Sequence, residues 1–483
     1  MINLRRFVLF GLGFVGLAGA LCGKPNVLFI VCDDLNTHVS SSGYAAIKTP
    51  NFDRLAAKGM TFDRAYCQYP VCGPSRASFL HGLYPEVTGV LSNTVDIRET
   101  RPGTVSLPQA FKEQGYWTAA TGKVFHNEKM DQGAVAWDEM KRFRNDELPV
   151  AAAAQIEFEA EHGSTTSREN RPKWRAYLEA FSTQTRGQSR PGYGRSGLTD
   201  DQHADGKNAR QAMAWLDQKA HGEKPFFMAV GIHKPHVPFL APDAYFDLYP
   251  QEELDFVKPP ADFWDEAPKT AMVKRYAAFG FELGKENDAL RREYLQAYHA
   301  SISFIDAQIG RIFDSLERND LWDDTIVVLI SDHGYQLGEH FMWGKVTLFE
   351  TCARVPMIIH APGVTRSGAT TEALVELIDL YPTLAELSGI NAPAELQGRS
   401  LVTNLADAEA TGKTATYTVV TRGDKLGKAL RTEEWRYAQW PDGEELYHLK
   451  VDPEEHHNLA RDPAHDGLLE TFRARLPEFG NDG

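Results

Sequence analysis

Cysteine is scarce in this sequence and odd in number. Five cysteines occur in 483 residues, namely Cys22, Cys32, Cys67, Cys72 and Cys352. A small secreted domain held together by disulfides would carry more cysteines, in an even number. The sequence therefore excludes a disulfide framework, although one bridge between Cys67 and Cys72 stays open as an alternative.

Positive charge is also in deficit. The chain has 51 Lys and Arg against 66 Asp and Glu, so its formal net charge is −15. This balance argues against general nucleic-acid binding. An anionic substrate would have to be attracted by a local cationic pocket, because the surface as a whole repels it.

Repeats and low-complexity segments are absent as well. With 42% hydrophobic residues the chain can bury a sizeable core, and nothing in its composition indicates global disorder. Its length allows either one large α/β domain with an appendage or about two to three domains.

No N-terminal apolar run is long enough to span a bilayer comfortably. The run over residues 7–17 follows two arginines and ends at an Ala-Gly-Ala cleavage site. This pattern predicts a signal peptide over residues 1–20 and export, to the periplasm or beyond, without stable membrane insertion. A membrane anchor is the alternative, whereas lipoprotein anchoring through Cys22 is disfavoured because the residues before it form a poor lipobox.

The regular pattern in the chain is a set of continuous apolar runs, each typical of a strand buried on both faces of a parallel sheet. They cover residues 26–32, 116–121, 225–232 and 325–330. Helical patterns lie between them, at residues 51–58, 107–114, 209–218 and 294–316. We therefore predict an α/β fold with a large mixed, mostly parallel sheet sandwiched by helices. Residues 141–206 and 250–287 are interpreted as insertions, the first an irregular surface segment that shapes the substrate entrance.

Polar residues suited to chemistry follow each apolar run. They are Asp33 and Asp34, then Lys123 and His126, then His233 and His236, and then Asp332 and His333, followed by His340 and Lys345. Ligands of open α/β sheets bind at the carboxyl ends of the strands, so we expect these side chains to converge. Among the candidate metal ligands Asp33, Asp34, Asp332 and His333, carboxylate oxygens predominate, which favours a hard cation such as Ca2+ over zinc.

A short loop over residues 69–82 contains the spaced motif Cys-x-Pro-Ser-Arg. Pro74 lacks a backbone donor, so we expect Cys72 and Gly73 to stay outside regular helix and Ser75 to cap a new helix. The thiol of Cys72 would then lie just before a helix N-terminus, which favours negative charge. A buried or disulfide-bonded cysteine beside a helix cap is the alternative.

This loop resembles the sulfatase signature C-x-P-S-R-x-S-x-L-x-G, which matches at Cys72, Pro74, Ser75, Arg76, Ser78, Leu80 and Gly82. The motifs at the strand ends resemble those of the iduronate-2-sulfatase-like group of this family, within the alkaline phosphatase superfamily. The resemblance covers residues 25–459. It implies hydrolysis of sulfate esters on a carbohydrate, either a polysaccharide or an oligosaccharide.

The resemblance also implies a cofactor set. A maturation enzyme would oxidise Cys72 to formylglycine, whose aldehyde hydrate is the nucleophile. Ca2+ would be held by Asp33, Asp34, Asp332, His333 and an oxygen of the formylglycine made from Cys72. Arg76 would stabilise the hydrate, and His126 would assist its deprotonation.

The remaining residues are implied to act on the substrate. Lys123 and Lys345 would bind sulfate oxygens, and His233 would protonate the leaving alcohol. His236 and His340 are expected to contact the substrate.

The C-terminal part of the sequence differs in character. Alternating runs at residues 415–420, 428–432, 436–440 and 445–449 predict a small antiparallel sheet. Residues 452–459 resemble the sulfatase C-terminal subdomain. We accordingly predict a catalytic domain over residues 21–400 and an α+β subdomain over residues 401–483.

Two other functions stay open. One is a phosphodiesterase or phosphonate hydrolase of the same superfamily, using the same nucleophile. The other is a non-catalytic, glycan-binding relative, which is disfavoured because no member of the implied constellation is missing.

Overall fold

The computed structural model describes residues 23–146, 149–174, 176–177, 192–273 and 288–477. The predicted signal peptide and parts of both predicted insertions lie outside these ranges. Within the described ranges, no helix combines the length and the apolar character that crossing a membrane requires.

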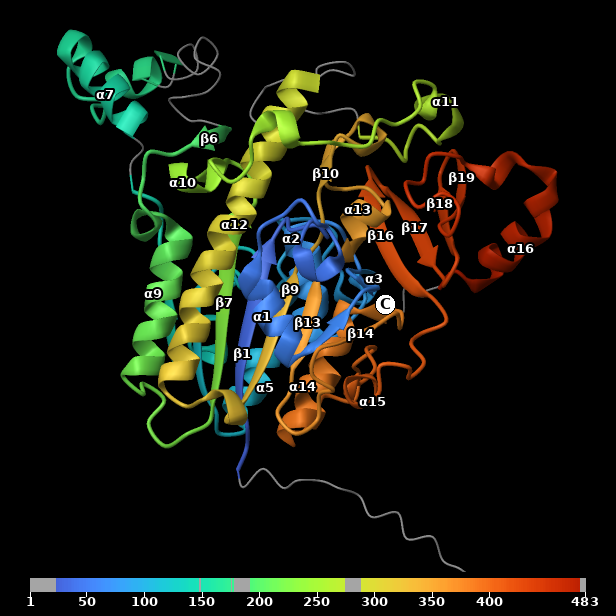
Figure 1. The fold of residues 1–483 in the computed structure, drawn as a ribbon, viewed down its shortest axis with the longest axis horizontal. Coiled ribbons are helices and arrows are strands. Elements are labelled where there is room, and N and C mark those ends of the chain that lie inside the picture. The colour runs from blue at the N-terminus through green and yellow to red at the C-terminus, as the bar shows by residue number, and fades with distance from the viewer. Residues whose placement is uncertain (1–22, 147–148, 175, 178–191, 274–287, 478–483) are drawn as a thin grey trace, which may run out of the picture.

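An eight-stranded sheet forms the centre of the larger domain, in the order β14-β2-β13-β9-β1-β7-β4-β5 (Figure 1). Its strands are β1 (Asn26–Asp33), β2 (Met60–Phe62), β4 (Trp117–Gly122), β5 (Glu139–Lys141), β7 (Phe226–Pro235), β9 (Thr325–Ser331), β13 (Met357–His360) and β14 (Ala369–Thr371). Only β13 is antiparallel to its neighbours, and the other described pairs are parallel. The predicted mixed, mostly parallel sheet is confirmed.

Two helical layers cover this sheet because side chains along a strand alternate between its faces. Leu28 and Ile30 of β1 point into one core, and Val27, Phe29 and Val31 point into the other. The first core includes residues of α1 (Pro50–Lys58), α9 (Ala204–Asp217) and α12 (Asp288–Arg318). The second includes residues of α2 (Cys72–His81), α5 (Leu107–Glu113) and α14 (Leu380–Ser388).

Smaller elements connect these layers. The short strands are β3 (Ala65–Tyr66), β6 (Tyr193–Arg195), β8 (Phe239–Ala241), β10 (Gln336–Leu337), β11 (Trp343–Gly344), β12 (Arg354–Val355) and β15 (Val375–Glu376). The short helices are α3 (Pro85–Thr88), α4 (Ile97–Thr100), α6 (Gly133–Ala136), α10 (Asp243–Phe246), α11 (Phe263–Glu266), α13 (Glu350–Ala353) and α15 (Val402–Ala406).

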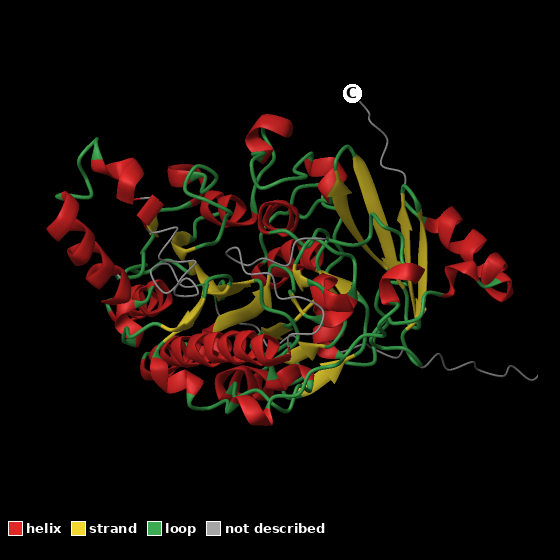
Figure 2. Cartoon of the chain, turned by 90° about the horizontal axis from the view of Figure 1, so that it is seen from above, coloured by secondary structure: helices red, strands yellow, loops and turns green. Residues whose placement is uncertain are grey.

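The C-terminal lobe is a four-stranded antiparallel sheet beside the larger domain (Figure 2). Its strands are β16 (Thr416–Arg422), β17 (Lys425–Arg431), β18 (Trp435–Trp440) and β19 (Gly443–His448). Helix α16 (Asp466–Arg475) packs on it, with the ring of Phe472 stacked on Tyr437 at 5.3 Å between centroids. The predicted antiparallel lobe is confirmed, and the boundary at residue 400 stays a prediction.

Two expectations about local structure need correction. Residues 141–206 are not irregular throughout, because α7 (Pro149–His162) is a regular helix, set apart from the layers that cover the sheet (Figure 1). The four described cysteines, Cys32, Cys67, Cys72 and Cys352, are all buried and free. The alternative of a Cys67–Cys72 bridge is therefore not realised.

Candidate functional site

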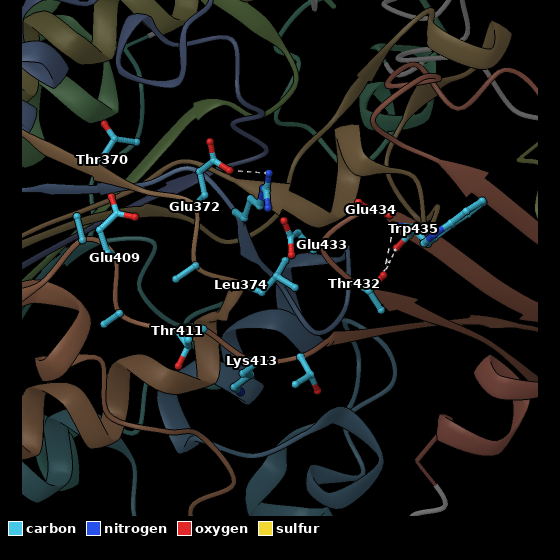
Figure 3. A pocket seen from close by; sticks show the side chains of 16 residues that line it. Thr370, Glu372, Leu374, Glu409, Thr411, Lys413, Thr432, Glu433, Glu434 and Trp435 are labelled. Carbon is cyan, nitrogen blue, oxygen red and sulfur yellow. Dashed lines mark hydrogen bonds and ion pairs between the residues drawn. The ribbon is translucent and has the colours of Figure 1, made fainter. Parts of the chain in front are cut away.

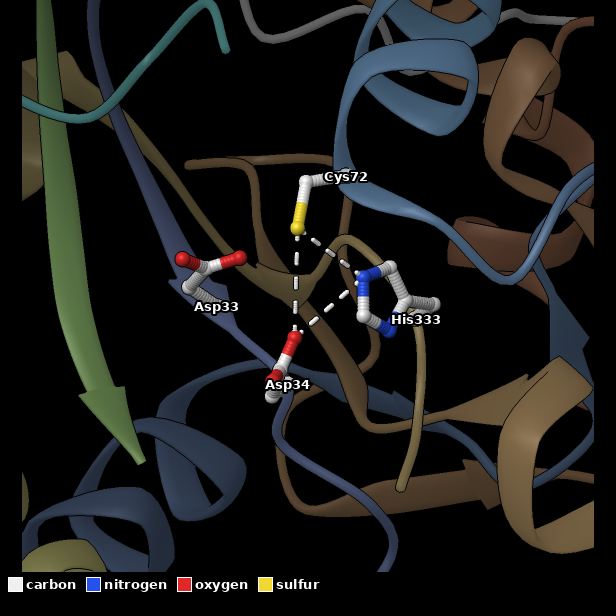
Figure 4. A group of neighbouring side chains, drawn as sticks. All are labelled: Asp33, Asp34, Cys72 and His333. Carbon is white, nitrogen blue, oxygen red and sulfur yellow. Dashed lines mark hydrogen bonds and ion pairs between the residues drawn. The ribbon is translucent and has the colours of Figure 1, made fainter. Parts of the chain in front are cut away.

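Four side chains meet beyond the carboxyl ends of β1 and β9, where Asp33, Asp34 and His333 face the thiol of Cys72 (Figure 4). Each offers one possible ligand atom, and these atoms all lie within 4.8 Å of one another. The Nε2 atom of His333 lies 3.3 Å from Asp34 Oδ1 and 3.4 Å from Cys72 Sγ. All four residues are buried.

The donor set fits a hard divalent cation. Among the described residues, Asp33 Oδ1 and Asp34 Oδ2 are buried and have no hydrogen-bond partner. A buried carboxylate oxygen without a partner is costly, and a cation is one way to satisfy it. Oxygen donors suit Ca2+, whereas the sulfur of Cys72 would suit a softer metal.

Cys72 reaches this position as the first residue of α2, which corrects the predicted helix start. Val71, not Ser75, lies at the N-cap, and Pro74 lies in the first helical turn. Proline is tolerated there because the first turn's N–H groups have no intrahelical partners. The hydroxyl of Ser75 instead donates to the backbone carbonyl of Asp332.

The surroundings of Cys72 favour a negative charge. Lys345 Nζ lies 3.0 Å from its sulfur. Burial by itself would raise the pKa of the Cys72 thiol, but Lys345 and Lys123, with His333, hold it well below its usual value. Burial likewise opposes the charged form of His333, yet Asp332 raises the pKa of His333 to about 9. An anion at position 72 therefore has cations on several sides.

Arg76 connects three of the elements that build the site. Its Nε donates to Asp332 Oδ2 at 2.8 Å, and its Nη1 donates to the carbonyl oxygen of Val124 at 2.8 Å and to that of Lys123. Asp33 Oδ1 lies 3.6 Å from Nη2. Arg76 is 1% exposed, so its guanidinium is a buried group that connects α2 to the ends of β1, β4 and β9.

Asp332 lies beside the group of four, outside the 4.8 Å set. Its Oδ1 accepts hydrogen bonds from the backbone N–H groups of Asp34 at 3.2 Å and His333 at 2.9 Å. Its role as a metal ligand stays a prediction, while its contacts with Arg76 and these N–H groups orient both neighbours.

The two predicted lysines each pair with one of the adjacent aspartates. Lys345 Nζ donates to Asp34 Oδ1 at 2.6 Å, and Lys123 Nζ donates to Asp33 Oδ2. Burial would lower the pKa of Lys345, but the negative charge of Asp34 outweighs this effect. The pKa of Lys345 is therefore raised well above its usual value, and the lysine stays protonated. Both ammonium groups thus lie next to the atoms that face Cys72.

A pocket of about 820 Å3 opens onto this group, and Asp33, Lys123, His126, His233 and His236 line it. Nε2 of His236 lies 4.0 Å from Asp34 Oδ2. Burial would lower the pKa of His236, but Asp34 and Asp33 raise it above its usual value. The structure therefore brings three of the four predicted histidines of the reaction and substrate sets to one pocket.

The fourth, His340, is packed elsewhere. It is 1% exposed, its ring stacks on Phe349 at 3.9 Å, and its Nε2 donates to the carbonyl of Glu454 in the C-terminal lobe. Its Nδ1 accepts from Gln336 Nε2 at 3.1 Å. Both ring nitrogens of His340 are engaged inside the protein, away from the pocket, and its expected substrate contact stays a prediction.

Residues that the sequence did not single out also belong to the pocket. Its rim includes Lys129, Arg142 and Arg144, and behind His233 lies the buried carboxylate of Asp205. Arg142 and Arg144 fall in the segment interpreted as an insertion and Lys129 lies before it, while Asp205 begins a helix, where acidic residues are ordinary. None of these four residues belongs to a sequence motif that would have indicated its place in the site.

A second pocket, of about 910 Å3, lies where the larger domain meets the C-terminal lobe (Figure 3). Its lining includes Glu372, Glu409, Glu433, Lys413 and Trp435. None of the predicted site residues reaches it.

Comparison with known proteins shows the family of the chain. The sulfatase family model matches residues 25–390. The chain belongs to the sulfatase family. A second model, of the C-terminal region of N-sulphoglucosamine sulphohydrolase, matches residues 338–482 of this sulfatase.

Similar proteins align over nearly the whole sulfatase chain. A sulfatase of Formosa agariphila is 34% identical over 470 residues, covering 94% of this chain and 87% of that protein. Mouse iduronate 2-sulfatase is 28% identical and covers 93% of each. In the structure of a phosphonate monoester hydrolase of Agrobacterium radiobacter, the fold matches with a TM-score of 0.74 at 22% identity, over 93% of this chain and 94% of that one. The alkaline phosphatase-like fold is thereby confirmed.

Proposed function

We propose that this protein hydrolyses sulfate esters of a carbohydrate, with a nucleophile made by oxidation of Cys72 to formylglycine and with Ca2+ as the metal. One observation carries the proposal: a buried cysteine on a sulfatase signature lies in one cluster with Asp33, Asp34 and His333, and each aspartate has one oxygen without a hydrogen bond and one bonded to a lysine. The similarity to iduronate 2-sulfatase supports a sugar sulfate as the substrate.

A thiol alone is poorly suited to this reaction, because transfer of sulfate to sulfur would leave an adduct with no easy exit. The aldehyde hydrate made from Cys72 would supply a nucleophilic hydroxyl and a second hydroxyl for release, beside the positive charge of the cation. Asp33, Asp34 and His333 would hold that cation, together with an oxygen at position 72.

The residues of the chain supply the remaining requirements. Lys123, bonded to Asp33, and Lys345, beside Cys72, would bind sulfate oxygens, because preorganised cations stabilise charge that develops during transfer. His233 lines the pocket and would donate a proton to the leaving alcohol, since a sugar alkoxide leaves poorly without one. His126 would accept a proton from the hydrate, and His236 would contact the substrate.

The signal peptide predicted at residues 1–20 supports export as part of this proposal. A formylglycine-generating maturation enzyme would act on Cys72 before the chain folds, because the folded chain leaves Cys72 only 1% exposed.

The experiment is peptide mass spectrometry of the protein from its native host, combined with assays on sulfated oligosaccharides and on phosphate diesters. We expect the Cys72 peptide to show conversion of the thiol to an aldehyde, and sulfate to be released. Cys72→Ala should abolish release, whereas Cys352→Ala, at another buried free cysteine, should retain it.

The phosphodiesterase alternative has its own observation, the fold shared with a phosphonate monoester hydrolase. Faster turnover of diesters than of sulfate esters by the converted protein would favour it. An unconverted thiol in host-matured protein would contradict both reactions and favour a glycan-binding relative.

A further inference from the structure

Asp205 is a buried carboxylate that the proposed chemistry has not yet used. It is 2% exposed and lies in the first turn of α9, where backbone N–H groups favour negative charge. Burial would raise the pKa of Asp205, but hydrogen bonds from His233 bring it below its usual value. The side chain is therefore an ionised acceptor held inside the protein.

Its contacts are concentrated on the end of β7. Oδ1 accepts a hydrogen bond from the backbone N–H of His233 at 2.8 Å and lies 3.2 Å from the ring atom Nδ1 of the same residue. Oδ2 accepts from the backbone N–H of Lys234 at 3.0 Å. One carboxylate thus holds both the backbone and the ring of His233.

These contacts determine which ring nitrogen of His233 carries a proton towards Asp205. An ionised carboxylate can only accept hydrogen bonds, so Nδ1 of His233 must carry a proton towards Asp205. The side chain of His233 is 34% exposed and lines the pocket together with Lys123 and Asp33. Nε2 is then the ring nitrogen left for exchange with a substrate.

The loop that follows is held independently. The ammonium of Lys234 donates to the carbonyl oxygen of His236 at 3.2 Å and to that of Pro238. His233 consequently belongs to a segment fixed on both sides, and Asp205 is the group that orients its ring.

We propose that Asp205 is the positioning residue of the general acid His233, an inference that rests on the proposed sulfatase reaction. In the step, sulfur forms a bond to the nucleophilic hydroxyl oxygen at residue 72, the S–O bond to the leaving alcohol breaks, and its electron pair goes to the alcohol oxygen. That oxygen takes the proton from Nε2 of the doubly protonated ring. His233 is left neutral with its proton on Nδ1, and Asp205 stays ionised throughout, as the aspartate of a Ser-His-Asp triad does.

The test is a leaving-group series with the converted Asp205→Asn protein. Phenyl sulfates with ring substituents from 4-nitro to 4-methoxy differ in leaving-group acidity but hardly in size. An acidic nitrophenol needs no proton, so we expect kcat/KM for 4-nitrophenyl sulfate to fall less than about threefold. For 4-methoxyphenyl sulfate we expect a fall of at least about tenfold, which is part of the roughly 10²–10⁴ that a general acid contributes.

Two controls separate positioning from a structural defect. Asp217→Asn changes an aspartate at the far end of α9, bonded to Ser315 and Asn319, and should leave the series unchanged. His233→Gln should show the same leaving-group dependence, and adding Asp205→Asn to it should cost little more, because Asp205 acts through His233. If Asp205→Asn does not accumulate as folded protein, Asp205→Ser is judged by the same criteria.

The outcomes are distinct. An equal loss on every phenyl sulfate, or additive losses in the double variant, would show a structural role and overturn the inference. No loss on 4-methoxyphenyl sulfate would overturn it too. Converted wild-type protein that is inactive on all sulfate esters would overturn the proposed function, and the inference with it.

Discussion

At the scale of single residues, the site depends on backbone conformations that the sequence does not predict. Asp34 has a φ of 64°, in the left-handed region that non-glycine residues seldom adopt. Tyr298 donates to its carbonyl oxygen at 2.7 Å, and Asp332 accepts from its N–H at 3.2 Å. Such strain persists only where the surroundings hold it, and it turns the Asp34 carboxylate towards Cys72.

Replacing Asp34 with asparagine tests the proposed metal directly. Asparagine tolerates the left-handed conformation, so the change removes mainly the charge. We expect Ca2+ to raise the thermal midpoint of chelator-treated wild-type protein, corresponding to about 2.7 kcal/mol when the ion is at 100 times its Kd. In Asp34→Asn the shift should be largely lost. Asp217→Asn should keep the full shift, and equal shifts in all three proteins would argue against a metal at this site.

At the scale of elements, the ends of two strands approach each other so closely that only glycine fits. A Cβ atom on Gly231 of β7 would lie 2.1 Å from the carbonyl carbon of Lys123, and one on Gly122 would lie 1.9 Å from the carbonyl oxygen of Gly231. The backbone N–H of Lys123 donates to that oxygen at 3.0 Å. This junction of β4 and β7 sets the position of Lys123, the lysine proposed to bind sulfate.

Gly231→Ala should therefore affect both stability and activity. The added methyl group must displace backbone, and overpacking of this kind costs about 1–3 kcal/mol. We expect a lower urea midpoint and a lower kcat, because Lys123 moves with the strand end. Gly467→Ala in α16, where a Cβ meets nothing within 4 Å, should be neutral or slightly stabilising. Unchanged kinetics in Gly231→Ala would contradict the role of the junction.

The contact between the larger domain and the C-terminal lobe is sensitive to acid through His340. Burial lowers the pKa of His340 to about 3, below the usual 6.5. The folded state therefore binds fewer protons than the unfolded state below pH 6.5, and stability falls as the pH drops. Because of one such histidine, the free energy of unfolding falls by about 2 kcal/mol between pH 7 and pH 5.

His340→Asn should reduce this acid sensitivity. Asparagine accepts the left-handed φ of 58° at this position and does not titrate. The variant is expected to lose about 2 kcal/mol less free energy of unfolding than the wild type between pH 7 and pH 5. Denaturant titrations at both pH values measure the difference, and parallel losses in the two proteins would exclude His340 as the sensor.

At the scale of the whole molecule, the net charge of −15 contrasts with the basic residues Lys129, Arg142 and Arg144 of the pocket, which lie among the acidic Asp96, Glu99 and Glu128. Arg142 pairs with Asp131, whereas the side chain of Arg144 is 92% exposed and lies 4.0 Å from Glu128. A cation in this place attracts an anionic oligosaccharide over a range set by the ionic strength.

Arg144→Glu should raise KM for a multiply sulfated oligosaccharide several-fold at low salt, and by less as salt is added. KM for 4-nitrophenyl sulfate should change little, because its single sulfate binds at the inner lysines. Arg168→Glu makes the same charge change at an exposed residue outside the described lining of the pocket and serves as the control. Equal changes in KM for the two variants would show that the net charge of the protein, and not the position of Arg144, causes the effect.

The sequence by itself determined the sheet and most of the site. Continuous apolar runs can only be buried, so the central strands β1, β4, β7 and β9 were predictable, and their polar ends had to meet at one edge. The signature around Cys72 indicated the position of the proposed nucleophile, because each of its residues has a spacing that packing alone does not require.

Only the tertiary structure decided the contacts made between distant segments. Asp205 orients His233 across 28 residues, and His340 packs on Glu454 rather than in the pocket. Neither side chain differs in type from an ordinary surface residue. The role of each residue depends on which element packs against it in the folded chain, and the local sequence does not indicate that element.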